Sequence, residues 1–207
     1  ELFDIDISGV IHIGACTGEE FPLYNEVGVD RVIWVEANPR LAQALSQRFI
    51  LTKGHSSFCF AASNESDKVL TLNVTSNLQS SSLLNLKKHE DIYPDIKVVE
   101  KIDVPTLTVD DFIDSYGIDP KSYNFLNLDI QGAELLALKG SQNLLRYIDY
   151  IYTEVNEEEL YEGCALIDEI DEFLTLFNFE RVKTHMTKER WGDAFYIKKQ
   201  APVVRFM

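Results

Sequence analysis

Four short and nearly continuous apolar runs most constrain what this chain can fold into. They are Val10–Ile13, Val32–Val35, Phe125–Ile130 and Tyr150–Val155. A strand that is apolar at every position is buried on both faces, which is typical of a parallel sheet with helices packed on either side. Because helical patterns lie between these runs, the sequence predicts an α/β protein with right-handed crossovers.

Three segments have the apolar spacing of helices. Pro39–Phe49 follows Asn38, a good N-cap ahead of a first-turn proline. Leu166–Phe177 places its apolar side chains on one stripe and its acids on the opposite face. Gly132–Leu145 is the third predicted helix.

Two segments depart from this alternation. Thr75–Lys101 is polar and irregular, too long for a simple connection, and is therefore a candidate lid or substrate loop. Near the end of the chain, "NFERVKTHM" and "DAFYIKK" flank the turn "TKERWG". That arrangement predicts a C-terminal hairpin that adds an antiparallel edge strand to the sheet.

Length and composition indicate one domain. The chain has 207 residues, of which 45% are hydrophobic, and it shows no internal repeat or long linker. We therefore expect a single domain over residues 1–207. The first residue is Glu1 rather than Met, so we expect either a trimmed chain or one domain of a longer polypeptide.

The net charge and the cysteine content limit the classes of ligand and the cellular compartment that we expect. The net charge is −15, from 34 acids against 19 bases, which disfavours nucleic acids and anionic membrane surfaces as ligands. No apolar run approaches the roughly 20 residues of a membrane span, and no signal peptide is evident. Three widely spaced cysteines indicate reduced thiols. We therefore expect a cytoplasmic protein.

A glycine loop follows the first apolar run, in "VIHIGACTGEE". Gly14 and Gly18 allow the backbone to turn tightly and to approach a ligand closely. Glu19 and Glu20 follow at the start of the next helix, where they would repel a triphosphate, so ATP and GTP are poor candidates.

Glu36 ends the second run, about 20 residues after the glycine loop, where a carboxylate accepts hydrogen bonds from both hydroxyls of a ribose. NAD and S-adenosylmethionine share that requirement. The loop lacks the third glycine of the dinucleotide motif, and the acids lie where NAD would place its pyrophosphate. An adenosine joined to an amino acid fits better.

The stretch "FLNLDIQGAELLALKG", Phe125–Gly140, carries a more specific signal. Together with the glycine loop, the acid in "VEANP", the "AAS" of Ala61–Ser63, the serines of Ser80–Ser82 and the "VPTLTVDDFI" segment, it resembles the FkbM family of S-adenosylmethionine-dependent methyltransferases. The resemblance runs from about Gly9 to Lys198. Asn127 and His12 depart from the family, in which Lys and Asp are common at these positions.

The resemblance implies a Rossmann-like class I methyltransferase fold, with a mostly parallel twisted sheet and helices on both faces. It implies S-adenosyl-L-methionine as cofactor, S-adenosyl-L-homocysteine as product, and O-methylation of a sugar hydroxyl, for example on a deoxysugar such as rhamnose within a glycan. Such an enzyme would be fused to, or act with, glycosyltransferases. A non-catalytic nucleoside- or glycan-binding module and an NAD-dependent reductase stay open as alternatives.

Candidate site residues follow from the loops and strand ends. The expected cofactor contacts are Gly14, Ala15, Cys16, Gly18, Glu36, Ala37, Ala62, Ser63 and Asp129. The candidate catalytic residues are Asp129, Glu154 and His185, because a hydroxyl nucleophile needs a group that takes its proton. Asp129 and Glu154 end neighbouring apolar runs, so we expect them at one rim of the sheet.

Alternative interpretations accompany these residues. Asp129 is otherwise a helix N-cap, and Glu154 a solvated acid in an acidic run. His12 lies inside an apolar run and is expected to be a core histidine, whereas Trp191 is a candidate for stacking on a sugar. No zinc-binding spacing is present, and a divalent ion at Asp129 is conceivable but not favoured.

Overall fold

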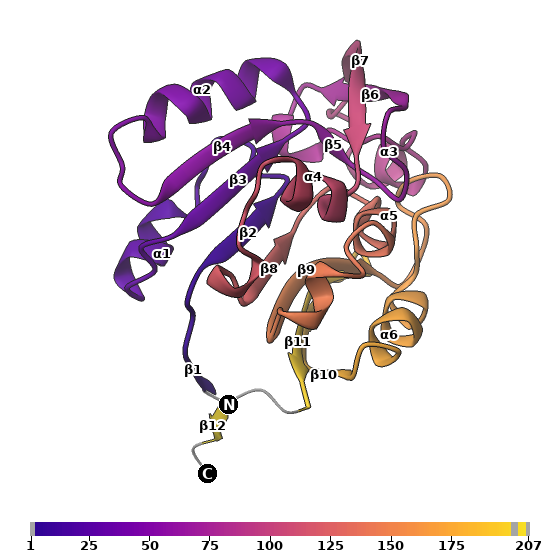
Figure 1. Cartoon of the computed structure of the whole chain (residues 1–207). Helices are drawn as coiled ribbons and strands as arrows, with labels where there is room; N and C mark the ends of the chain where they lie inside the picture. The colour runs from indigo at the N-terminus through magenta and orange to yellow at the C-terminus, as the bar shows by residue number, and fades with distance from the viewer. Residues whose placement is uncertain (1–2, 200–202, 206–207) are drawn as a thin grey trace.

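The computed structural model describes residues 3–199 and 203–205 of the chain. Its centre is a seven-stranded sheet in the order β10-β11-β9-β8-β2-β3-β4 (Figure 1). The strands are β2 Val10–Ile13, β3 Val32–Glu36, β4 His55–Cys59, β8 Phe125–Leu128, β9 Tyr150–Asn156, β10 Phe179–Met186 and β11 Trp191–Lys198.

Strand directions confirm the predicted mostly parallel sheet. Strands β4, β3, β2, β8 and β9 are parallel neighbours, whereas β11 is antiparallel to both β9 and β10. The C-terminal hairpin forms as predicted. Its antiparallel strand β11 lies inside the sheet, and β10 forms the edge.

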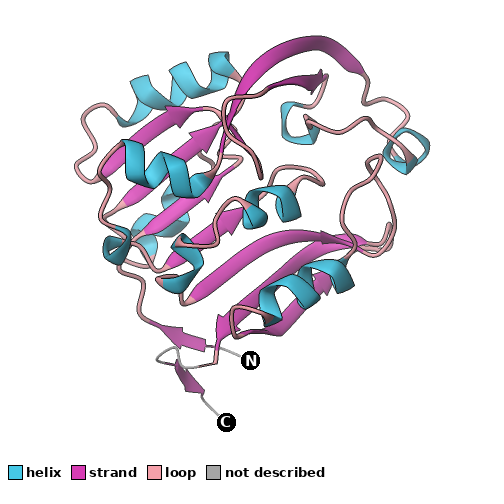
Figure 2. Ribbon diagram, turned by 45° about the vertical axis from the view of Figure 1, so that its right-hand side comes forward, coloured by secondary structure: helices cyan, strands magenta, loops and turns pink. Residues whose placement is uncertain are grey.

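Helices cover both faces of this sheet, as Figure 2 shows. The helices are α1 Phe21–Glu26, α2 Pro39–Phe49, α3 Lys88–Ile92, α4 Val109–Ser115, α5 Glu134–Lys139 and α6 Ile167–Thr175, with short 3-10 turns η1 Leu78–Ser80, η2 Pro120–Ser122 and η3 Leu144–Arg146. In β2, Ile11 and Ile13 pack in the core under α4, α5 and α6, whereas Val10 packs in the core under α1 and α2. Burial on both faces explains why the strand is apolar at every position except His12.

The helices predicted over Pro39–Phe49 and Leu166–Phe177 are confirmed as α2 and α6, and the third is shorter than predicted. Helix α2 begins after Asn38, whose side chain accepts a hydrogen bond from Arg40 N at 3.0 Å. Helix α5 was predicted over Gly132–Leu145 but ends at Lys139. A Cβ on Gly140 would lie 2.1 Å from the carbonyl oxygen of Ser63, so this glycine permits a close backbone contact at the helix end.

A second, three-stranded sheet lies beside the first, in the order β5-β7-β6. Its strands are β5 Ala61–Ala62, β6 Val69–Thr75 and β7 Val98–Leu107. The prediction of an irregular segment over Thr75–Lys101 is therefore wrong at both ends, because Thr75 and residues 98–101 pair in these strands. Residues 76–97 connect β6 to β7, and they include η1 and α3.

Short strands β1 Phe3–Ile5 and β12 Val203–Arg205 form a separate antiparallel pair below the main sheet in Figure 1. Across the part of the chain that the structure describes, every helix is too short or too polar to cross a membrane.

Candidate active site

A pocket opens at the carboxyl ends of β2, β3 and β8, where ligands bind in open α/β sheets. It holds about 750 Å³ of space between protein atoms, including the part open to solvent. Residues of β5, β6 and the 76–97 segment form its other wall. The second sheet and the segment that follows β6 therefore complete a site that the first sheet begins.

The glycine loop brings the ends of β2 and β8 together. Gly14 has φ +88°, and a Cβ at this position would lie 1.8 Å from the carbonyl oxygen of Asp129. The backbone N–H groups of Gly14 and Ala15 both donate to Val35 O, at 2.9 and 3.0 Å. Only glycine fits here, because any side chain would separate the two strand ends that carry the site.

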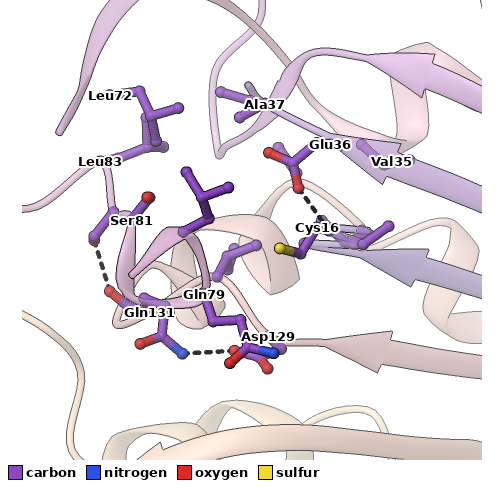
Figure 3. Close-up of a pocket in the computed structure, with 18 of the residues that line it drawn as sticks. Cys16, Val35, Glu36, Ala37, Leu72, Gln79, Ser81, Leu83, Asp129 and Gln131 are labelled. Carbon is purple, nitrogen blue, oxygen red and sulfur yellow. Dashed lines mark hydrogen bonds between the residues drawn. The ribbon is translucent and has the colours of Figure 1, made fainter. Parts of the chain in front are cut away.

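Glu36 is held at the pocket wall by two backbone donors. Its Oε2 accepts from Cys16 N at 2.8 Å (Figure 3). Its Oε1 accepts from Asn38 N at 2.7 Å. Burial raises the pKa of this carboxyl, and the backbone hydrogen bonds oppose that shift. Each oxygen keeps a second lone pair, so the carboxylate remains able to accept the hydroxyls of a ribose.

The other walls of the pocket suit an adenosine without phosphates. Phe60, Leu72 and Leu83 supply apolar surface around the space beside Glu36. Glu19 and Glu20 add carboxylates, and none of the described lining residues is Lys or Arg. A phosphate would therefore be repelled, whereas a positively charged sulfonium is compatible with this wall. The residues present fit S-adenosylmethionine.

The remaining expected cofactor contacts divide into two groups. Cys16, Ala37 and Ala62 line the pocket, and burial together with the charge of Glu36 raises the pKa of the Cys16 thiol to about 11. Gly18 and Ser63 lie outside the lining. Gly18 turns the loop against the ring of Phe49, where a Cβ would lie 3.0 Å from that ring, and its contact with the cofactor stays a prediction.

Asp129 follows β8 directly and its side chain opens into the pocket. Its Oδ1 accepts a hydrogen bond from Gln131 Nε2 at 2.7 Å. Burial among protein groups raises the pKa of Asp129 to about 6, while this hydrogen bond opposes the shift and the charges of Asp193 and Glu20 add to it. The N-cap interpretation is wrong, because α5 begins five residues later and its N-cap is Ala133.

Glu154 lies beside Asp129 on the neighbouring strand β9, as the sequence predicted. Its side chain is buried, with 5% exposed, so it is not a solvated acid. Glu154 Oε2 accepts from the same Gln131 amide nitrogen at 2.6 Å. Burial and the charge of Asp129 raise the pKa of Glu154 well above its ordinary value, so we assign the proton of this pair to Glu154.

His185 is not part of this arrangement, which corrects the sequence prediction. It is exposed on the edge strand β10, opposite Asp193 on β11, which in turn lies opposite Glu154 on β9. Neighbouring strands are about 4.8 Å apart, so three spacings place His185 roughly 14 Å from Asp129. That distance is too great for a proton acceptor at the pocket.

His12 is a core histidine, as expected. It is 1% exposed, its Nδ1 lies 3.0 Å from the hydroxyl of Tyr24, and burial lowers its pKa to about 3. Trp191 is partly buried, and its indole N–H donates to the hydroxyl of Tyr93 at 3.0 Å. Its stacking on a sugar stays a prediction.

Sequence reasoning found Ala62 of the second sheet but missed other residues that this sheet and the 76–97 segment contribute. Leu72, Gln79 and Leu83 line the pocket but have no motif that would reveal them. Gln131 does lie inside the "DIQG" motif, and its place in the family stretch was the available signal. Among the described residues, no three His, Cys, Asp or Glu side chains are grouped so that they could hold a metal ion.

The sheet order, with one antiparallel strand next to the edge, and a pocket with apolar walls and carboxylates are those of a Rossmann-like S-adenosylmethionine-dependent methyltransferase. A model of the methyltransferase FkbM domain matches residues 12–181. The chain therefore belongs to the FkbM methyltransferase family.

Individual proteins resemble the chain over different lengths. The 2-O-methyltransferase NoeI of Sinorhizobium fredii is 31% identical over 106 residues, which are 49% of this chain and 43% of NoeI. The match therefore spans less than half of that relative.

Solved structures share the fold at low identity. Streptococcus pneumoniae Sp1610 in complex with S-adenosyl-L-methionine superposes with a TM-score of 0.53 at 10% identity, covering 94% of this chain and 68% of that one. A NADB-Rossmann superfamily protein of Streptococcus agalactiae gives 0.52 at 11% identity, covering 95% of this chain and 64% of that one.

Proposed function

We propose that the chain is an O-methyltransferase that acts on a hydroxyl of a neutral sugar within a glycan, for example a deoxysugar such as rhamnose. The name of NoeI supports transfer to an oxygen, and the FkbM resemblance supports a sugar acceptor. The carboxyl groups at the pocket support a neutral acceptor, because they would repel an anionic one.

The residues of the first sheet would hold the methyl donor. Glu36 would accept the ribose hydroxyls, the Gly14–Cys16 backbone would lie along the amino acid part, and Phe60 and Leu72 would contact the adenine. S-adenosylmethionine supplies a methyl group that its sulfonium already activates for displacement. The protein therefore needs to align the acceptor oxygen and to receive its proton.

The observation that carries the proposal is the Asp129 carboxyl group beside the donor pocket. With a pKa near 6, it is mostly ionised at neutral pH and yet more basic than an ordinary aspartate. Asp129 would accept the hydroxyl proton at its carboxylate as the new bond forms. Glu154, which holds a proton, would leave Asp129 as the charged member of the pair.

The cellular location, the partners and the domain organisation belong to the same proposal. We place the enzyme in the cytoplasm, acting with or fused to glycosyltransferases that make its acceptor, and we treat residues 1–207 as one domain. The three cysteines are free thiols, which is compatible with a reducing compartment.

Transfer of a trideuterated methyl group tests this function. The protein is incubated with labelled S-adenosylmethionine and methyl glycosides of rhamnose, fucose and glucose, with glucuronate and catechol as anionic and phenolic controls. Mass spectrometry should find the label on a neutral sugar, together with S-adenosylhomocysteine. Label on the catechol alone would contradict a sugar acceptor. Tight S-adenosylhomocysteine binding without any transfer would favour the non-catalytic module.

Asp129→Asn tests the assigned base in the same assay. The change keeps the shape of the side chain but removes its charge, so turnover should fall about 10²–10⁴-fold while donor binding is largely kept. Near-normal turnover with saturating donor and acceptor would make Asp129 structural, and Glu154 would become the next residue to test.

A further inference from the structure

We propose that Gln131 is a positioning residue, which holds the side chains of Asp129 and Glu154 together and aims the Asp129 carboxylate into the pocket. The inference rests on the proposed function, in which Asp129 accepts the proton of the acceptor. Gln131 itself lines the pocket, two residues after Asp129 (Figure 3).

Both hydrogens and the oxygen of the Gln131 side-chain amide have a hydrogen-bond partner. Its Nε2 donates to Asp129 Oδ1 at 2.7 Å and to Glu154 Oε2 at 2.6 Å, which uses both of its hydrogens. Its Oε1 accepts from the hydroxyl of Tyr161 at 2.6 Å. If the amide were flipped, its oxygen would face the two carboxyl groups. Asp129, Glu154 and Tyr161 therefore determine the orientation of the amide.

The backbone of Gln131 is held as firmly as its side chain. The residue has φ +55°, in the left-handed region that non-glycine residues rarely occupy, and Gly132 follows with φ +98°. The Ser82 hydroxyl donates to Gln131 O at 2.7 Å, and Tyr161 is fully buried. Such a conformation persists where its surroundings enforce it, and it is common at functional sites.

A neutral amide between two carboxyl groups matters because no cation offsets them. Asp129 and Glu154 make no ion pair within residues 3–199. The titratable groups that face the pair from neighbouring elements carry or can acquire negative charge, and they are Cys16, Glu20, Glu36, Glu134, Tyr152, Tyr161 and Asp193. Gln131 is therefore the donor that stabilises the ionised form of Asp129.

Loss of this donor should change both the position and the acidity of the base. The hydrogen bond from Gln131 lowers the pKa of Asp129 against the effect of burial. Without it the pKa rises, so the limb of the pH–rate profile in which activity increases with pH moves to higher pH. The freed carboxylate also leaves its fixed orientation, which lowers turnover at every pH.

Gln131→Met is the principal test, because methionine has a similar length and no hydrogen-bonding amide. With a sugar acceptor and saturating donor, we expect kcat at pH 7 to fall about 10–100-fold and the acid limb to move up by about half a pH unit or more. The affinity for S-adenosylhomocysteine should change less than about threefold. Gln142→Met is the matched control, because Gln142 is exposed and its side-chain amide donates to Lys139 O.

Tyr161→Phe provides a second variant that keeps Gln131 in place. It removes the donor to Gln131 Oε1 and should move the acid limb in the same direction by a smaller amount. Melting temperatures of both variants, read alongside Gln142→Met, show whether each one folds. An unchanged acid limb in both folded variants would overturn the positioning role.

An NMR titration, which needs no turnover, separates the proposed function from the proposed role of Gln131. The carboxyl carbon of Asp129, assigned with Asp129→Asn, can be titrated by NMR in the ligand-free protein. A higher pKa in Gln131→Met, together with no methyl transfer to any sugar, would support the hydrogen-bonded arrangement and reject the proposed acceptor. The same pKa in both proteins would reject the role of Gln131 even if sugars are methylated.

Discussion

Glu36, Asp129 and Glu154 carry the same functional group, but their surroundings assign them different states. Glu36 receives two backbone hydrogen bonds and is suited to accept ligand hydroxyls. Asp129 opens into the pocket and is suited to accept a proton, whereas Glu154 is enclosed and keeps one. The burial of each carboxyl group and the hydrogen-bond donors around it decide these roles, because the functional group is the same in all three.

Glu36→Ala should weaken the binding of S-adenosylhomocysteine by roughly 1.5–3 kcal/mol, because charge-assisted hydrogen bonds to the ribose are lost. Isothermal titration calorimetry measures the change, and Glu26→Ala serves as an exposed control. An unchanged dissociation constant would show that Glu36 does not contact the donor.

Glu154→Gln should stabilise the protein, and more so as the pH rises. The folded pKa of Glu154 lies above its unfolded value, so its contribution to stability is complete below about pH 4.5 and is lost as pH rises towards the folded pKa. Glutamine mimics the protonated form and removes this loss. Urea unfolding should show a gain on the order of 1–3 kcal/mol at pH 8 and little gain at pH 5. Equal gains at both pH values would contradict the raised pKa.

At the scale of elements, the 76–97 segment links the donor pocket to the loop after β9. Gln79 donates to Glu19 at 2.7 Å, and Leu83 lies on the pocket wall. On its other side, Lys87 and Lys88 pair with Glu159 and Glu158. Ser82 pairs with Asn73 and donates to Gln131 O, and the backbone N–H groups of Lys87 and His89 donate to Leu160 O. These bonds hold the later part of the segment, so we expect opening over residues 76–81 only, as the sequence suggested for a lid.

Hydrogen exchange should report this opening. Amides of residues 78–81 should exchange faster in the free protein and become protected when S-adenosylhomocysteine and acceptor are bound, because this stretch lies at the pocket. Amides of β7 at Val104 and Thr106 serve as the control, since both residues are buried in the central strand of the second sheet. Strong and equal protection of residues 78–81 in both states would reject the lid.

At the scale of the whole molecule, the acidic surface and the cation-free pocket select against phosphates. The net charge of −15 adds to the local field of Glu19, Glu20 and Asp129. ATP and NADH should therefore bind at least about 100-fold more weakly than S-adenosylhomocysteine, by the sum of these repulsions. Calorimetric titration in low salt measures this, and comparable affinity for NADH would contradict the assignment of the pocket.

Much of this fold could be predicted from local sequence. Val32–Val35 is apolar at every position and Val10–Ile13 at every position except His12, because both faces of each strand are buried, so a covered parallel sheet follows from the sequence pattern. Asn38 ahead of Pro39 marks the start of α2 for a reason that lies within one helical turn. Gly14 and Glu36 could be proposed as ligand contacts because strand ends in parallel sheets share one edge.

Other features depend on contacts between residues that are distant in the chain. Gly140 ends α5 against Ser63, and Leu72 reaches the pocket only because β6 pairs with β7. The link from Gln131 to Glu154 joins residues 23 positions apart. His185 shows the converse, since a plausible catalytic residue lies three strands from Asp129. Hydrophobic patterns and turn residues are local properties and determined the layers of this protein, whereas strand order and side-chain approach arise only when the chain packs, and they decided the site.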